Sequence, residues 1–176
     1  MELKKIQKKI QKCINLLYSI DAELFKRNSG KGVCERCLVF RFAHYLQNEL
    51  GENYSVDCDF NSSSYLDKKG KVIKLPGKRF PELGSDGKMK LKRRFIDIIV
   101  HRRGSDSVGS FFCFEIKKWN NYNKKGIEKD KRNLRWLVRG YKYDYAFWLV
   151  LGKTKEGSKW EIYNRQGASS KLKSIF

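Results

Sequence analysis

One aspartate and a short triplet are the residues of this chain best suited to joint chemistry. Seventeen residues separate Asp97 from the triplet Glu115-Ile116-Lys117. Both lie in segments that read as β-strands, and alternate residues of a strand share one face, so Glu115 and Lys117 point the same way. Two carboxylates beside an ammonium group are typical of a site for a divalent metal ion with a lysine next to it.

Two neighbouring strands must position these side chains. The segments 94–101 and 110–117 have the apolar content of strands, and a glycine- and serine-containing connection joins them. We therefore predict a hairpin in which the strand of Asp97 lies next to that of Glu115. The apolar residues that alternate with the charged positions of the second strand should face a core.

Two helices are predicted ahead of this hairpin. Residues 2–27 carry apolar side chains at helical spacing and form an amphipathic helix, and residues 33–50 form a second helix that ends at Gly51. Glu35 lies three residues before Leu38, which places it on the apolar stripe of the second helix. A carboxylate that faces a core usually has a partner or a metal ion, but the helix dipole also favours an acid in the first turn. Both interpretations of Glu35 remain open.

The rest of the chain continues the alternation of strand and helix. The further predicted elements are a strand at 54–60, a long loop at 61–93 with a short hairpin around 71–75, a helix at 126–139, a strand buried on both faces at 143–151 and a last short strand at 160–163. No linker or repeat divides the chain, so we expect one α/β domain, 1–176. Its parts are an N-terminal helix region 1–32, a core of about 33–152 and a C-terminal extension 153–176.

The charge of the chain indicates a polyanionic partner. Its 39 basic and 19 acidic residues give a net charge of +20, which is more than solubility requires and points first to nucleic acid. The basic residues are spread along the chain, and two basic stretches, 61–95 with 11 of them and 117–142 with 10, lie on either side of the acidic pair in the sequence. The candidate phosphate contacts are Lys78, Arg79, Lys92, Arg93, Arg102, Arg103, Lys118, Lys131 and Arg135.

Other classes of protein and site have less support. No apolar run approaches the roughly 20 residues of a membrane-spanning helix, and no signal peptide is evident, so we expect a cytoplasmic protein without a membrane partner. The five cysteines are expected to be reduced, and Cys34 and Cys37 lack the second ligand pair of a zinc site. The two histidines fall in different predicted elements, which gives a serine–histidine or cysteine–histidine arrangement little support.

The acidic pair, the lysine and the order of the elements resemble the PD-(D/E)xK nuclease superfamily. The resemblance covers about residues 33–152 and implies a restriction-endonuclease-like three-layer core, with a mixed central sheet flanked by helices and an extra amphipathic helix at the N-terminus. It matches Asp97 to the metal-binding aspartate, Glu115 and Lys117 to the D/E-x-K triplet, and Glu35 to the acid of the first core helix. The proline that names the motif is absent, since Ile96 precedes Asp97.

This resemblance implies a hydrolase that cuts phosphodiester bonds, an endonuclease on DNA more than on RNA. Mg²⁺, for which Mn²⁺ can substitute, would lower the pKa of a bound water and act as a Lewis acid. The expected ligands are the carboxylates of Asp97 and Glu115 and the carbonyl of Ile116, with Glu35 holding the metal through water or forming a second site. Lys117 would lie beside the scissile phosphate and stabilise its negative charge.

Three alternatives compete with this prediction. The charged residues could form a salt-bridged edge of a half-exposed sheet. The chain could be a nucleic-acid-binding subunit that retains the nuclease fold without catalysis, in which case binding would depend on salt and not on metal. It could also serve in a protein–protein interaction, with interface anchors supplied by Trp119, Tyr122, Trp136 and Trp160. A homodimer is expected if two strands are cut, because two active sites are then needed.

Overall fold

The structure, a computed structural model, describes residues 1–26, 34–60, 64–66, 72–74, 79–83, 87–102, 110–120, 123–141, 143–166 and 170–176. Its helices are α1 (Leu3–Ile20), α2 (Glu35–Leu50) and α3 (Lys124–Gly140), with short 3₁₀ turns η1 (Ala22–Phe25) and η2 (Lys155–Gly157). Its strands are β1 (Ser55–Phe60), β2 (Ser64–Leu66), β3 (Val72–Lys74), β4 (Arg79–Leu83), β5 (Met89–Arg93), β6 (Ile96–His101), β7 (Ser110–Lys118), β8 (Tyr145–Leu151), β9 (Lys159–Asn164) and β10 (Lys173–Ser174).

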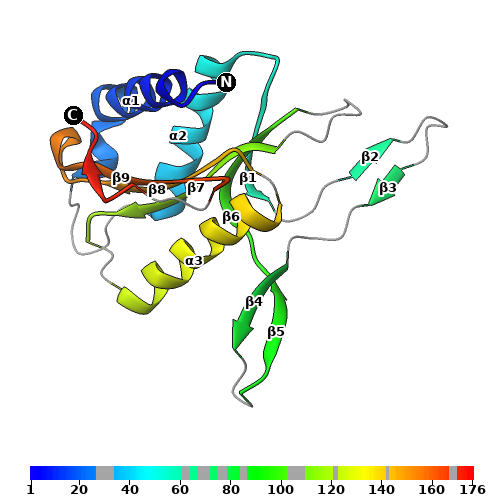
Figure 1. The fold of residues 1–176 in the computed structure, drawn as a ribbon. Coiled ribbons are helices and arrows are strands. Elements are labelled where there is room, and N and C mark those ends of the chain that lie inside the picture. Colours follow the sequence, from blue (N-terminus) through cyan, green and yellow to red (C-terminus); the bar gives the residue numbers. More distant parts are fainter. Residues whose placement is uncertain are drawn as a thin grey trace.

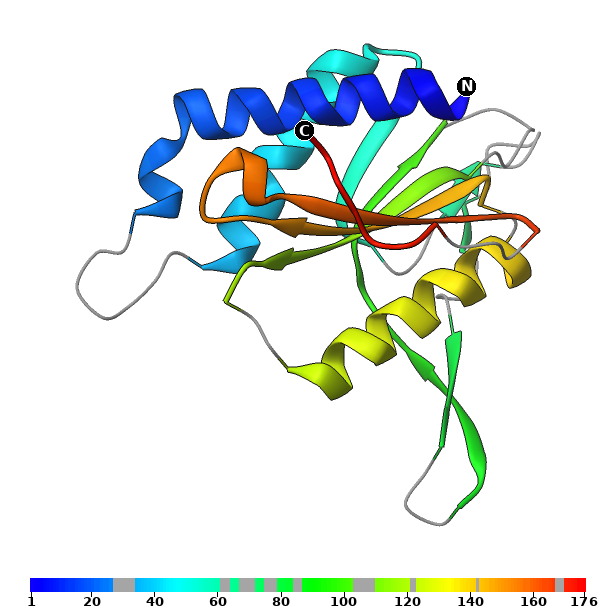
Figure 2. The same ribbon diagram turned by 60° about the vertical axis from the view of Figure 1, so that its left-hand side comes forward.

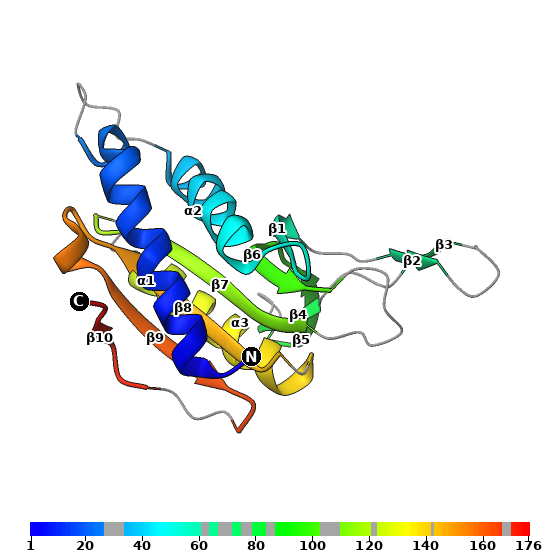
Figure 3. The ribbon, with the colours of Figure 1, turned by 90° about the horizontal axis from the view of Figure 1, so that it is seen from above.

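A mixed six-stranded sheet occupies the middle of the molecule, in the order β1-β6-β7-β8-β9-β10. Strands β7 and β8 run parallel, and every other neighbouring pair in this sheet is antiparallel. The parallel pair needs a crossover connection, which α3 supplies. Helices α1 and α2 cover one face of the sheet and α3 covers the other (Figures 1, 2 and 3). The chain is therefore a mixed α/β protein with its sheet between helices.

Each face of the sheet has its own core. Phe112, Phe114 and Ile116 of β7 are fully buried and pack against α1 and α2. Cys113, which points to the other face, packs with Leu134 of α3. Full burial of a phenylalanine or isoleucine side chain stabilises the fold by about 2 kcal/mol. The predicted alternation along β7 is confirmed, and Glu115 and Lys117 lie on the α3 face.

The predicted helices are confirmed with one difference in length. Helix α1 ends at Ile20 instead of continuing to about residue 27, and the chain then takes the short turn η1. Helix α2 ends at Leu50 as predicted, and the Gly51 that follows has φ of +74°, a conformation that glycine adopts without steric cost. Within the described part of the chain, no helix combines the length and the apolar content that crossing a membrane requires.

The region 61–93 differs more from the prediction of a long loop. Strands β2 and β3 pair with each other, which confirms the short hairpin expected near residues 71–75. Strands β4 and β5 form a second hairpin that the sequence analysis missed. Pro81 lies within β4, and the alternating lysines of β5 are poor strand formers, so local propensity did not favour these strands.

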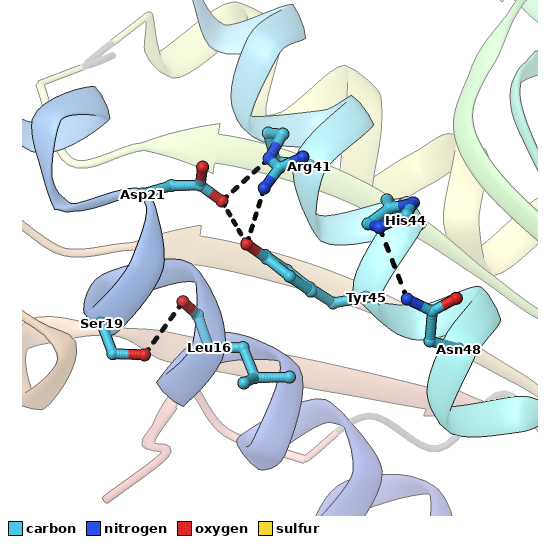
Figure 4. A network of polar contacts seen from close by, with 7 residues as sticks. All are labelled: Leu16, Ser19, Asp21, Arg41, His44, Tyr45 and Asn48. Carbon is cyan, nitrogen blue, oxygen red and sulfur yellow. Dashed lines mark hydrogen bonds and ion pairs between the residues drawn. The ribbon is translucent and has the colours of Figure 1, made fainter.

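A polar network follows the end of α1 at Ile20 (Figure 4). Asp21 follows the helix, and its Oδ2 accepts hydrogen bonds from Arg41 Nε at 2.9 Å and Tyr45 Oη at 2.6 Å. Arg41 also donates to the Tyr45 hydroxyl at 2.8 Å. Burial acts to raise the pKa of Asp21, but the hydrogen bonds and charge of its two partners on α2 lower it below its usual value. The network thus joins the end of α1 to the middle of α2.

Asp21→Asn is expected to lower the free energy of unfolding by about 1 kcal/mol at pH 7, since Arg41 is partly exposed and solvent screens the pair. The folded-state pKa of Asp21 lies below its unfolded value of about 3.9. Its contribution is therefore present above about pH 4 and is lost as the pH falls through the folded-state pKa. Urea unfolding at several pH values measures this difference. Ser19→Ala, which removes only an exposed hydrogen bond to the Leu16 carbonyl, is the control.

Candidate active site

Strands β6 and β7 bring Asp97 and Glu115 together. The two strands are antiparallel neighbours, and Ile98 pairs with Phe114. One residue further along, this register places Asp97 opposite Glu115. The hairpin predicted from the sequence is confirmed, and both carboxylates lie on the face of the sheet that α3 covers.

The two carboxyl groups contact each other in a buried setting. Glu115 is 4% exposed and is a hydrogen-bond partner of Asp97. Asp97 Oδ2 also accepts a hydrogen bond from the backbone amide of Ile116 at 2.7 Å. Burial, followed by the charge of Asp97, raises the pKa of Glu115 well above its usual value. Burial likewise raises the pKa of Asp97, although the Ile116 amide and the charge of Lys117 oppose the change.

Lys117 lies among carboxylates from four elements, α2, β6, β7 and α3. Its Nζ is 3.1 Å from Asp130 Oδ2 and 3.5 Å from Glu35 Oε1, and its side chain is 15% exposed. Burial alone would lower the pKa of Lys117, but the charges of Asp130, Asp97, Glu35 and Glu115 raise it above its usual value. The ammonium group is therefore held charged beside the Asp97–Glu115 pair.

Glu35 reaches the same place from the first turn of α2. Its Oε2 accepts a hydrogen bond from the backbone amide of Lys118 at 3.1 Å, and its Oε1 faces Lys117. Of the two interpretations left open by the sequence, the structure supports a carboxylate with a partner. Glu35 joins the N-terminus of α2 to the end of β7, where the charged residues gather.

Asp130 of α3 is a member of this site that the sequence analysis missed. It lies three residues after Ile127 and four before Leu134, and so falls on the apolar stripe of α3. That position was the available signal, because a carboxylate among core-facing residues needs a partner. Its partner, Lys117, is on a different element, so helix periodicity alone did not identify it.

We expect Asp130→Asn to slow any reaction of the site by about tenfold, because Lys117 Nζ would lose its nearest carboxylate and its fixed position. The change should appear in kcat and leave KM nearly unchanged, since Asp130 contacts Lys117 and would not contact the substrate itself. Single-turnover measurements check this split. Glu128→Gln, an exposed acid two residues earlier on the same helix, should leave kcat unchanged, and an equal loss there would contradict a positioning role for Asp130.

The candidate phosphate contacts fall into three groups: residues that are exposed, residues outside the described part of the chain, and residues that already have partners within the protein. Arg79, Lys92, Arg93 and Arg102 are exposed, whereas Lys78 and Arg103 lie outside the described residues. Arg135 is 42% exposed in its side chain and lies near Glu128 and over the ring of Tyr163.

Lys118 and Lys131 already have partners within the protein. Lys118 is 8% exposed, and its Nζ lies 4.7 Å from the centre of the Trp119 ring. Lys131 Nζ is 2.7 Å from Glu161 Oε2 and 4.4 Å from the centre of the Trp148 ring. Contact with a phosphate would require either lysine to leave these partners.

The donor atoms suit a hard divalent cation. Asp97 and Glu115 present carboxylate oxygens, the ligands that Mg²⁺ prefers, and a cation there would favour the charged forms that burial disfavours and so lower both raised pKa values. Glu35 is turned towards Lys117 and the Lys118 amide. Among the described residues, no group of three or more histidine, cysteine, aspartate or glutamate side chains has the arrangement of a metal site. Asp97 and Glu115 can supply two of the oxygen ligands that such a cation takes.

Comparisons with known proteins do not assign the chain to a family. No family model matches the sequence. No curated protein and no solved structure matches it either.

Proposed function

We propose that this chain is a Mg²⁺-dependent nuclease of the PD-(D/E)xK type, with a restriction-endonuclease-like fold, that hydrolyses phosphodiester bonds in DNA. The observation that carries the proposal is the buried Asp97–Glu115 carboxyl pair on adjacent strands, with Lys117 held charged beside it. The sheet between helices and the β7-α3-β8 crossover support the fold assignment.

The metal would be held by Asp97, Glu115 and the Ile116 carbonyl. When bound, Mg²⁺ supplies an activated water and a Lewis acid for the phosphoryl group. The amide of Ile116 holds Asp97 through its Oδ2, which fixes the carboxylate before the cation binds. Burial of Glu115 excludes water from one side of the site, so the electrostatic interactions there are stronger than in solvent.

Lys117 is the group that would contact the substrate. Its ammonium can donate hydrogen bonds to the oxygens of the scissile phosphate and stabilise the charge that develops on them. Glu35 and Asp130 hold Lys117 Nζ from two helices on opposite faces of the sheet. This arrangement orients the lysine without placing either carboxylate on the substrate.

The surface charge supports a nucleic acid as the substrate. A net charge of +20 favours a phosphate backbone. Three exposed basic residues, Arg79, Lys92 and Arg93, belong to the β4–β5 hairpin. This hairpin leads directly into β6, so phosphates bound to it would contact the segment of the chain just before Asp97.

A second candidate is a nucleic-acid-binding subunit without catalysis. It is favoured by the engagement of Glu35 and Asp130 with Lys117, which leaves two carboxylates for a metal. In that case binding would be independent of metal and would survive loss of the acidic pair.

A cleavage panel tests the two functions against each other. Purified protein is incubated with supercoiled plasmid, linear duplex, single-stranded DNA and RNA, in Mg²⁺, Mn²⁺ or EDTA. The proposal expects DNA cleavage with either metal, none in EDTA, and none by Asp97→Asn. Intact nucleic acids under all conditions, together with tight binding in EDTA, would support the non-catalytic subunit and overturn the nuclease.

A further inference from the structure

The β4–β5 hairpin is a surface that the proposed catalytic site leaves unused. Its strands form a two-stranded sheet of their own, separate from the six-stranded sheet. The hairpin projects away from the body of the protein past α3 (Figures 1 and 2). Strand β5 leads through Arg94 and Phe95 directly into β6, which carries Asp97.

The base of this hairpin is held firmly against α3. Phe80 is 1% exposed and packs with Tyr141 and the core beneath α3. The backbone of Arg79 donates to the Tyr141 hydroxyl at 2.7 Å, and its carbonyl accepts from Trp136 Nε1 at 3.2 Å. Because the base is anchored, the projecting part has a defined direction relative to the sheet.

The two faces of the hairpin differ. Residues that pair across an antiparallel hairpin share a face, so Phe80 and Lys92 lie on the face turned towards α3. Met89 and Leu91, at alternate positions, lie on the opposite face and are 63% and 60% exposed. Phe95, two residues beyond β5, is 68% exposed. The hairpin therefore presents large apolar side chains to its surroundings.

Basic residues alternate with these apolar side chains along β5, and two basic residues, Lys92 and Arg94, pair with Glu82 of β4. Between Gly87 and Phe95 the chain has five basic residues and no acidic one: Lys88, Lys90, Lys92, Arg93 and Arg94. Lysine is depleted in protein–protein interfaces, so this composition argues against a protein partner. Cations beside exposed apolar groups match a duplex groove, where phosphates line the edges and base edges form the floor.

We infer that the β4–β5 hairpin enters the major groove of B-form DNA, with Met89 and Leu91 against the base edges. The major groove is about 12 Å wide and admits a two-stranded ribbon. The major groove of A-form RNA is too narrow, and a single strand has no groove. The eight steps from Met89 to Asp97 span at most about 26 Å, less than one turn of the duplex, about 34 Å. One DNA molecule can thus meet the hairpin and the site.

This inference rests on the proposed function for the role of Asp97, but its test does not require cleavage. Binding is measured by fluorescence anisotropy in EDTA, with a DNA duplex, an RNA duplex of the same sequence and a DNA single strand. We expect the wild-type protein to prefer the DNA duplex. The double variant Met89→Ser/Leu91→Ser should lose about tenfold in affinity for the DNA duplex, because two apolar contacts are removed. Its affinity for the other two ligands should be unchanged.

Ile20→Ser is the matched control, since Ile20 is 62% exposed at the end of α1, on another part of the molecule. It should bind like the wild type. Equal affinity of the wild type for both duplexes, or a double variant that binds DNA normally, would overturn the inference. A double variant that loses dimers in light scattering but keeps its DNA affinity would also overturn it, and would assign the hairpin to a second copy of the chain.

Failure of the inference and failure of the proposed function give different results. If wild type and the double variant both cut DNA equally well in Mg²⁺, the catalytic proposal stands and the role of the hairpin is lost. If the double variant loses DNA binding in EDTA but the wild type cuts nothing in Mg²⁺, the hairpin keeps its role and the catalytic proposal fails.

Discussion

Glu115→Gln will abolish Mg²⁺-dependent DNA cleavage, with a loss of at least about 10³-fold, and will make the metal-free protein more stable. The loss of activity follows because an amide is a poor ligand for Mg²⁺. The gain in stability follows because Glu115 is buried against Asp97, with a raised pKa. The folded state therefore binds more protons than the unfolded state, and stability falls as the pH rises from about 4.3 through the folded-state pKa.

The Glu115→Gln substitution removes this loss of stability at high pH because the glutamine side chain is neutral at every pH. We expect the free energy of unfolding of Glu115→Gln in EDTA at pH 8 to exceed that of the wild type by on the order of 1 kcal/mol, with little difference near pH 4. Urea unfolding at both pH values measures this. Added Mg²⁺ should stabilise the wild type only, because it binds the folded site.

Glu161→Gln is the matched control. Glu161 lies on the same row of the sheet, since Glu115 pairs with Trp148 and Trp148 with Glu161, and its side chain is 13% exposed and paired with Lys131. Glu161→Gln should keep cleavage and lose stability. If Glu115→Gln is less stable than the wild type at pH 8 and still cuts DNA, Glu115 has a structural role in the charged cluster around Lys117 and no role in catalysis.

Lys117→Met should lose about 10²- to 10³-fold in kcat and should also be less stable than the wild type. The loss in rate reflects the removal of the ammonium group that would stabilise charge on the scissile phosphate. The loss in stability arises because four carboxylates, Asp97, Glu115, Glu35 and Asp130, would surround an uncharged side chain. Removing one partner from such a part-buried cluster costs about 3 kcal/mol. Single-turnover cleavage and urea unfolding measure the two effects.

A variant that loses stability elsewhere separates these effects. Arg41→Met removes the partner of Asp21 on the other face of the sheet and should lower stability without changing the rate. The stability changes of Lys117→Met and Glu115→Gln should have opposite signs in EDTA. Stability changes of the same sign would contradict the electrostatic description of the site. A Lys117→Met enzyme that cuts DNA at the wild-type rate would show that Lys117 has no role in the reaction.

The sequence by itself determined most of the elements and the first three members of the site, Asp97, Glu115 and Lys117. Alternation along 110–117 placed Glu115 and Lys117 on one face, and neighbouring strands brought in Asp97. These inferences succeeded because strand alternation and hairpin pairing are local properties of the chain. The same reasoning missed β4 and β5, whose proline and lysines are unfavourable in strands. Packing of Phe80 under α3 and cross-strand pairing hold that hairpin in place.

Only the tertiary structure decided what the charged side chains contact. Glu35 was ambiguous in the sequence and faces Lys117, and Asp130 enters the site from α3, on the opposite face of the sheet from α2. Lys118 and Lys131, expected on the binding surface, lie against Trp119 and Trp148. These contacts depend on where each helix crosses the sheet. Residues more than 80 positions apart, such as Glu35 and Lys117, meet through packing that no local periodicity encodes.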